Sequence, residues 1–246
     1  MLFKAITNQI EALDTDAISM LRKDALQSLI NYIKHKADHD KPIQLNFICT
    51  HNSRRSHLSQ VWAQALALHF NIKHVYCYSG GTETTALYPA AAKALESSGF
   101  EIESQVQGIN PLYKIKYAEN QAAIMGFSKT YDHDSNPKAD FAAILTCSQA
   151  DKGCPFIPGA EVRIPMPFED PKAFDNTPLK TIKYLERSLQ IATELKYIFS
   201  FIFLCRSYKN LVYLSLQNLQ DIIFSISQHY QYKLLLHLDL KHLFYL

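Results

Sequence analysis

A cysteine and an arginine, with five residues between them, lie in a run that joins an apolar stretch to an amphipathic one. This spacing is typical of a nucleophile loop that binds an anion. The backbone N–H groups of such a loop, with the positive end of the helix that follows, can surround a tetrahedral oxyanion above the cysteine sulfur. The same field favours the ionised thiolate, which is the nucleophilic form of cysteine. The residues of the predicted anion-binding loop are Cys49, Thr50, His51, Asn52, Ser53, Arg54, Arg55 and Ser56.

The last three residues of this loop have separate predicted roles. Arg55 must turn back over the anion, where its planar guanidinium can bind two oxygens at once. Ser56 stands at the expected start of the next helix, where its hydroxyl can donate to the sulfur and stabilise its charge. Arg54 either adds attraction for the anion or points into solvent. We favour the second, because Arg55 already has the required spacing.

A cysteine and an arginine at this spacing also occur by chance, so the prediction of an anion loop depends on the elements on either side. Residues 44–48 are predicted to form a short buried strand. Residues 56–70 are predicted to form a helix with one apolar face. A strand, an anion loop and a helix in succession are the parts of a phosphate-binding unit.

A second stretch carries two further cysteines after a predicted strand over residues 140–146. Cys147 and Cys154 have six residues between them, which is wider than the usual spacing of paired zinc ligands. Glycine and polar residues between them favour a segment that can unwind, so that the two Cα atoms approach to the ~5.5–6 Å of a disulfide. The alternative is that both thiols are small buried apolar groups.

The loop resembles that of the low-molecular-weight protein tyrosine phosphatase superfamily, which includes the thioredoxin-coupled arsenate reductases. The family loop is usually written C-x-G-N-S-x-R-S, and this chain departs from it at His51, where the family has glycine. If that position needs a positive φ, histidine has a conformational cost there. The resemblance implies an α/β fold with a short, mostly parallel four-stranded sheet between helices. It places the loop at the carboxyl end of the first strand.

The two further cysteines are similar to those of the arsenate reductase branch. In that branch the loop thiolate attacks arsenate, a second cysteine displaces arsenite, and a third forms a surface disulfide with the second. Thioredoxin then reduces this disulfide. The resemblance assigns these three roles to Cys49, Cys147 and Cys154.

An acidic residue followed by proline, on a loop that closes over the anion, is the next shared feature. Asp170 is the predicted general acid, because Phe168 and the flanking prolines can partly desolvate it so that it holds a proton. Glu169 is the nearby alternative, and we expect it to be solvated. Tyrosine phosphatases of the superfamily usually follow the proline with two tyrosines that flank the substrate ring. This chain has Lys172, Ala173 and Phe174 instead, which favours a small oxyanion unless Phe174 or Tyr88 replaces the aromatic wall.

The chain is predicted to have three parts. Residues 41–200 carry the resemblance and form the predicted catalytic domain. Residues 1–40 are predicted to be a helical extension that packs on it. Residues 201–246, rich in leucine, tyrosine, phenylalanine and isoleucine, form an appended tail of unknown role. Charged residues interrupt the tail, so it contains no run of the ~20 apolar residues that span a bilayer.

Three further elements are predicted from local patterns. A helix from Ala17 to Lys36 has an apolar stripe and is expected to be capped by Thr15 or Asp16. An inserted hairpin is expected over residues 113–127. A long closing helix is expected over residues 179–199.

Composition favours a cytoplasmic enzyme. A chain of 246 residues can bury a full core, and its net charge of +2 predicts no preference for nucleic acid. We expect no signal peptide and no membrane partner, and the odd count of five cysteines fits reduced thiols. Neither a metal nor a bound cofactor is predicted; the expected partner is thioredoxin or a similar dithiol donor.

The sequence therefore predicts a reductase that converts arsenate to arsenite. The first alternative is a phosphatase for phosphotyrosine or small phosphoesters, which would use Cys49, Arg55 and Asp170 without the other two thiols. The second is a protein that binds an oxyanion without turnover, which the His51 departure and the unusual extensions favour.

Overall fold

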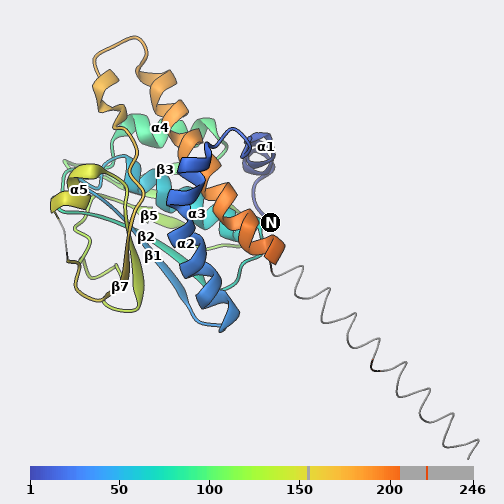
Figure 1. Ribbon diagram of the computed structural model, residues 1–246. Coiled ribbons are helices and arrows are strands. Elements are labelled where there is room, and N and C mark those ends of the chain that lie inside the picture. Colours follow the sequence, from blue (N-terminus) through green and yellow to red (C-terminus); the bar gives the residue numbers. More distant parts are fainter. Residues whose placement is uncertain (154–155, 206–219, 221–246) are drawn as a thin grey trace, which may run out of the picture. The chain divides into compact units, whose positions relative to one another are not determined.

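The computed structural model describes residues 1–153, 156–205 and 220 (Figure 1). The chain divides after Phe203, and the elements that position the site lie in the first unit, Met1–Phe203. The predicted third thiol, Cys154, lies outside the described residues, and so does most of the predicted tail.

The main sheet has four parallel strands, and the loop cysteine is the last residue of one of them. β1 (Ile43–Cys49) lies inside the sheet, and Cys49 pairs with Gly81 at the end of β2. The strand order is β2 (Val75–Gly81), β1, β6 (Phe141–Leu145) and β7 (Ala160–Pro165). The predicted α/β fold is confirmed, and the sheet is wholly rather than mostly parallel. The anion loop follows the carboxyl end of the first strand, as predicted.

Alternate side chains of the inner strands point into two cores, because successive residues of a strand face opposite sides of a sheet. On β1, Leu45 and Phe47 belong to the larger core, whereas Ile48 belongs to a smaller core that includes Cys49 and Cys147. Figure 1 shows two of the helices that bury the larger core, in blue and in orange, side by side. The helices that contribute to this core include α2 (Met20–Asp38), α3 (Arg55–His69) and the helix Lys180–Cys205.

The N-terminal extension is helical, as predicted, and its buried side chains join the larger core. The predicted cap at Thr15 or Asp16 is wrong. Ser19 is the N-cap of α2, and its side-chain oxygen accepts a hydrogen bond from the Arg22 N–H at 3.3 Å. Asp16 instead closes a turn, because its N–H donates to the carboxylate two residues before it at 2.8 Å. A second helix, α1 (Lys4–Ala12), precedes this turn.

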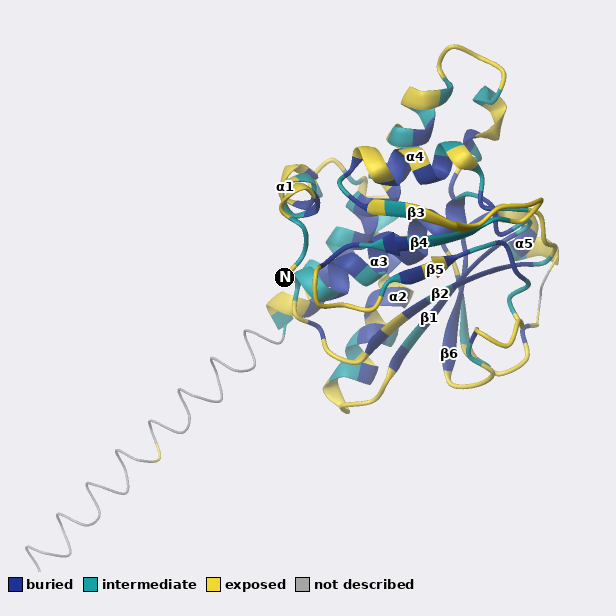
Figure 2. Cartoon of the chain, turned by 180° about the vertical axis from the view of Figure 1, so that it is seen from behind, coloured by how far each residue is buried: buried dark blue, intermediate teal, exposed yellow. Residues whose placement is uncertain are grey.

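An antiparallel sheet of three strands is inserted between α4 (Pro89–Ser97) and β6. The predicted hairpin is confirmed as β4 (Leu112–Lys116) and β5 (Ile124–Gly126). The third strand, β3 (Glu101–Val106), pairs with β4 and was not predicted. Its side chains are almost all exposed, as the yellow colour in Figure 2 shows, so the sequence lacks an alternating apolar pattern there.

The closing helix, predicted over residues 179–199, runs from Lys180 to Cys205. Among the described residues it is the one helix that is long and apolar enough to cross a membrane, and 44% of its most apolar window is buried inside the protein. A core helix passes the same test of length and composition. The helix is therefore weak evidence of a membrane span.

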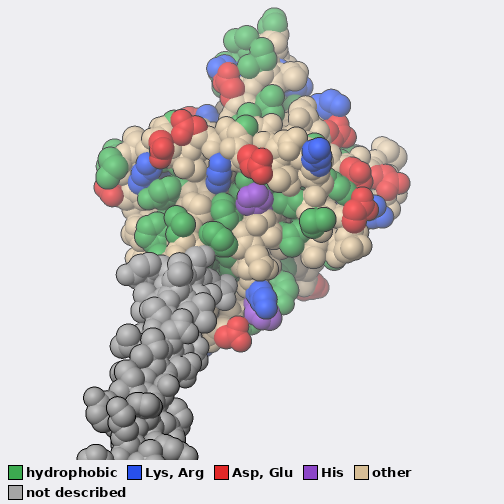
Figure 3. Space-filling view, turned by 90° about the vertical axis from the view of Figure 1, so that its right-hand side faces the viewer, with side chains coloured by type: hydrophobic (Ala, Val, Ile, Leu, Met, Phe, Trp, Pro, Cys, Tyr) green, Lys and Arg blue, Asp and Glu red, His purple; other side chains and the backbone are tan. Residues whose placement is uncertain are grey.

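Charged side chains of both signs are mixed on the face of the molecule that Figure 3 shows. The sequence has 25 lysines and arginines and 23 aspartates and glutamates. Such a mixture produces no extended field of one sign on this face.

Candidate active site

The loop cysteine lies at the end of β1, where its sulfur contacts a serine of the same loop, which an asparagine of the loop also binds. Cys49 is 3% exposed, and its Sγ lies 3.1 Å from Ser56 Oγ. Asn52 Nδ2 donates to the same oxygen at 2.9 Å. Because Ser56 Oγ accepts from Asn52, its own hydrogen is available to donate to the sulfur. Ser56 thus lies where the sequence predicted a hydroxyl donor to the sulfur, at the start of α3.

The conformational strain of the loop falls on Asn52 and not on His51. Asn52 has a φ of 44°, and His51 is not among the described residues with positive φ. Asparagine tolerates this region better than most residues do. Its Oδ1 also accepts from the Lys129 N–H at 2.9 Å, which fixes the side chain. The condition for a conformational cost at His51, a positive φ, is therefore not met.

His51 instead connects the loop to neighbouring segments. Its carbonyl accepts from Ser128 Oγ at 2.8 Å and from Thr85 Oγ1 at 3.3 Å. Its Nε2 lies 3.5 Å from a carboxylate oxygen of Glu83. The departure from the family pattern is thus accommodated by a backbone that other residues hold in place.

Two glycines at the end of β2 allow the loop to lie directly against the neighbouring backbone. A Cβ on Gly81 would come within 2.7 Å of both Asn52 N and Thr50 O, and one on Gly80 would lie 2.3 Å from Tyr131 Cα. The N–H of the residue after Gly81 donates to the Cys49 carbonyl at 3.2 Å. These contacts require residues without side chains and serve as scaffold for the loop.

The predicted clamp and the predicted general acid meet in the structure. Arg55 Nη2 lies 2.5 Å from Asp170 Oδ2, and its Nη1 donates to the Phe168 carbonyl at 2.9 Å. Arg55 Nε is buried and has no hydrogen-bond partner among the described residues, so it is a donor that an oxyanion oxygen can use. Asp170 Oδ1 accepts from the Lys172 N–H at 3.0 Å. The acid is thereby held at the start of the short 3₁₀ helix Pro171–Phe174.

Arg54 is not solvated, contrary to the interpretation that we favoured. Its Nε donates to the Tyr184 hydroxyl at 2.6 Å, and its Nη2 lies 2.8 Å from Asp175 Oδ2. The guanidinium also lies over the Tyr88 ring, 4.1 Å from the centroid. These partners occupy the side chain, because cationic planes bind both carboxylates and aromatic faces.

The second predicted thiol lies beside the anion loop. Cys147 is 1% exposed, and its Sγ lies 3.5 Å from Thr50 Oγ1. Its Sγ also accepts from the Ala150 N–H at 3.3 Å. The segment after it is a short helix, α5 (Ser148–Gly153), whose first turn starts on the Cys147 carbonyl. The prediction that this segment can unwind stays a prediction.

A cavity of about 860 Å³ is lined by residues of the anion loop, of the Cys147 segment and of the loop that carries Asp170, but Cys49 is not among its lining residues. Neither Phe174 nor Tyr88 lines it: Tyr88 stacks on Tyr184 with ring centroids 5.5 Å apart, and Lys183 Nζ lies over the Phe174 ring. The suggested replacement for the aromatic wall is therefore wrong. The lining residues are His51, Arg55, Cys147, Ser148, Gln149, Pro167, Phe168, Glu169, Asp170, Lys172 and Ala173.

Two buried ionisable groups behind the loop were missed. His57 is fully buried, and burial followed by the charge of Lys129 lowers its pKa to about 3. Lys129 is 4% exposed and has its ammonium 4.7 Å from the centroid of the Phe127 ring; burial lowers its pKa to about 8. The sequence signal was weak, because His57 lies between a polar and an apolar residue and Lys129 in a polar segment.

Within the described part of the chain, no group of three or more histidine, cysteine, aspartate or glutamate side chains could hold a metal ion. The site's charged residues are instead arranged around a cysteine and an arginine. A parallel sheet whose inner strand ends in a loop of this kind defines an α/β protein with a cysteine-based oxyanion site.

Comparison with known proteins agrees with this class, although no family model matches the chain. An arsenate reductase of Brevibacillus brevis is 29% identical over 126 residues, which are 51% of this chain and 74% of that protein. An arsenate reductase of Staphylococcus aureus strain Newman is 30% identical over 126 residues, 51% of this chain and 76% of that protein. The chain belongs to the family of these arsenate reductases, and so to a family of enzymes.

Among solved structures, the chain is similar to a low-molecular-weight phosphotyrosine phosphatase of Vibrio cholerae O395. The two share 13% sequence identity, with a TM-score of 0.42, over 68% of this chain and 97% of the other.

Proposed function

We propose that this protein reduces arsenate to arsenite through Cys49, Cys147 and Cys154. The Cys49 thiolate attacks arsenic, and one hydroxyl leaves as water with a proton that Asp170 takes from solvent and passes on. The Cys147 thiolate then attacks the Cys49 sulfur. The S–As bond breaks, its electron pair stays on arsenic, and arsenite leaves.

The remaining thiol restores the nucleophile. Cys154 attacks the Cys147 sulfur of the mixed disulfide, releases Cys49 as a thiolate and forms a disulfide between Cys147 and Cys154. A thioredoxin-type dithiol then reduces this disulfide by the same exchange chemistry. Both electrons that reach arsenic thus come from protein thiols, and no bound cofactor is needed.

The observation that carries the proposal is the position of Cys147. A phosphatase needs no second thiol, yet Cys147 lines the cavity that Arg55 and Asp170 also line, and it contacts the residue after Cys49 through Thr50 Oγ1. Cys49 and Cys147 also belong to one buried core. Displacement of arsenite requires such a thiol beside the loop that carries the nucleophile.

Charges around the cavity support the oxyanion step. Arg55 supplies a buried Nε–H that has no partner among the described residues. Its two Nη atoms already bind oxygen atoms of residues 166–170, which we call the acid loop. An arriving oxyanion can therefore be bound by Arg55 beside Asp170, which positions the acid near the oxygen that must leave.

A phosphatase is the second candidate, and the pairing of Asp170 with Arg55 favours it as much as it favours a reductase. The cavity lining argues against an aromatic phosphoester, because Lys172 and Ala173 stand where an aromatic wall is expected. A protein that binds phosphate without turnover is the third candidate.

Replacement of Cys147 by serine separates these candidates. We expect arsenate-dependent oxidation of a thioredoxin system to fall to background, because arsenite cannot be displaced from Cys49. Any hydrolysis of a small phosphoester should remain within about twofold of the wild-type rate, because Cys147 takes no part in it.

The matched control is Cys77→Ser. Cys77 is another buried cysteine, and burial raises the pKa of its thiol, but it does not line the cavity. This variant should retain arsenate reduction. Full reduction by Cys147→Ser would contradict the relay, and wild-type protein that binds phosphate but turns over neither substrate would support the third candidate.

A further inference from the structure

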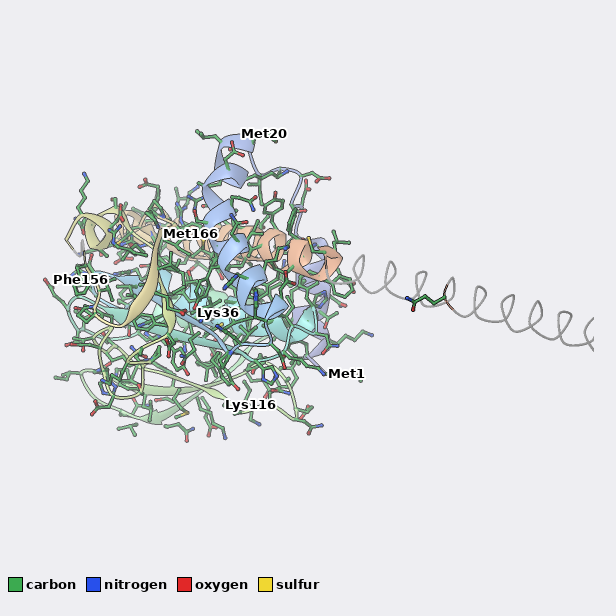
Figure 4. The ribbon with its side chains drawn as sticks, turned by 60° about the horizontal axis from the view of Figure 1, so that its bottom comes forward. Met1, Met20, Lys36, Lys116, Phe156 and Met166 are labelled. Carbon is green, nitrogen blue, oxygen red and sulfur yellow. The ribbon has the colours of Figure 1, made fainter. Side chains whose placement is uncertain are left out.

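The acid loop is held from its outer side by an arginine of the N-terminal extension. Arg22 lies in the first turn of α2, and its Nη2 donates to the Pro167 carbonyl at 3.1 Å. Its guanidinium carbon lies 5.1 Å from the centroid of the Phe168 ring. Figure 4 labels Met20, at the start of α2, and Met166, the residue before Pro167.

Arg22 is itself fixed by a buried carboxylate of the closing helix. Its Nη2 and Nε lie 2.7 and 2.9 Å from Glu194 Oε2, and the Glu194 side chain is 4% exposed. Gln190 Nε2 donates to the other carboxylate oxygen at 3.2 Å. A guanidinium bound to a desolvated carboxylate has few alternative positions, so it provides a rigid support for the loop.

The inner side of the same loop carries the catalytic groups. The Phe168 N–H donates to the Thr146 carbonyl at 3.1 Å, and the Phe168 carbonyl accepts from Arg55. Asp170 follows two residues later and pairs with the same arginine. Phe168 is therefore held between Arg22 on one side and Arg55 on the other, and its position determines that of Asp170.

We propose that Arg22 is a positioning residue for the general acid Asp170, so that the N-terminal extension is part of the catalytic apparatus. Glu194, Arg22, Phe168 and Asp170 form one connected path from the closing helix to the cavity. Arg22 does not line that cavity, so it acts through the acid loop and not on the substrate. The catalytic part of this inference rests on the proposed function.

The test compares Arg22→Met with Lys34→Met on the same helix. Lys34 pairs with Asp38 at 3.1 Å on the surface of α2, about three helical turns away from Arg22, so its loss should change nothing at the site. In Arg22→Met, we expect faster hydrogen exchange at the Phe168 and Lys172 amides and about a tenfold lower kcat, with KM changed less. In an Asp170→Asn background the Arg22→Met substitution should lower kcat no further, because the group that it positions is already gone.

Two further variants keep the test decisive. Arg22→Met/Glu194→Gln removes both charges and avoids an unpaired buried carboxylate that could prevent folding. Arg22→Lys keeps the charge but loses the planar fork, and should rescue kcat only in part. Exchange equal to that of Lys34→Met, or a kcat loss that persists undiminished beside Asp170→Asn, would overturn the inference. If the wild-type protein turns over neither arsenate nor a phosphoester, the proposed function fails, while the exchange comparison still decides whether Arg22 holds the loop.

Discussion

The anion loop and the segment that carries Cys147 differ in their contacts. The nucleophile's partners are near it in the sequence, whereas a partner of Cys147 is far from it. In the loop, Cys49 and Asn52 both bind Ser56 within eight consecutive residues, and Gly81 of β2 lies directly against the loop backbone. Cys147 instead depends on Thr50, far away in the chain, and on a short helix. Neighbouring residues therefore determine the geometry around the Cys49 sulfur, whereas the position of Cys147 depends on how two distant segments meet.

The largest effect on kcat/KM should come from Arg55→Lys, which removes the guanidinium of the anion loop and leaves Cys147 in place. Lysine keeps the charge but loses the planar fork and the buried Nε–H, so kcat/KM should fall roughly 10²–10³-fold for arsenate and for any phosphoester alike. Steady-state assays and phosphate titration by calorimetry measure this. A loss confined to arsenate would mean that the loop is not the shared oxyanion site.

An intermediate effect, on the free energy of unfolding, should come from replacing one glycine in each of the two regions by alanine. Gly81→Ala places a Cβ against Asn52 N and should lower the free energy of unfolding by roughly 1–3 kcal/mol. Gly153→Ala is the matched change in the Cys147 segment, where a Cβ meets nothing within 4 Å, and should be neutral or stabilising by up to about 1 kcal/mol. Urea denaturation compares them. Equal destabilisation by both would contradict the tighter packing that we ascribe to the loop.

A smaller, pH-dependent effect should arise from His57 behind the loop. Its folded pKa of about 3 lies below the ordinary value of 6.5, so between these pH values the unfolded chain binds more protons than the folded one. Stability should therefore fall as pH drops from about 6.5 toward 3, by at most about 1.4 kcal/mol per pH unit. His57→Gln should flatten this slope in urea titrations at successive pH values. His35→Gln, an exposed change on α2, should leave it as in the wild type, and an unchanged slope in His57→Gln would refute the assignment.

The sequence predicted what neighbouring residues encode. The strand before Cys49, the helix after Ser56 and the hairpin of β4 and β5 carry their own periodic patterns, and the structure confirms them. β3 was missed because it is exposed and lacks such a pattern, and β7 because it is an edge strand that carries Glu161 and Arg163.

Side-chain partners from distant segments were the part that could not be predicted. Arg54 was expected in solvent because nothing nearby shows that Tyr184 and Asp175 will bind it. Arg22 was not singled out, since its contacts with the acid loop span 145 positions of the chain. The roles of Asp170 and Cys147 came from resemblance, and their positions in one cavity agree with those roles without testing them.

One measurement tests the central claim most directly. Reduced protein is mixed with arsenate in the absence of any other reductant, quenched with an alkylating agent and mapped by mass spectrometry. The proposed relay predicts one arsenite released per chain, a disulfide between Cys147 and Cys154, and an alkylated Cys49. Full alkylation of all three cysteines after exposure to arsenate, with no arsenite released, would contradict it.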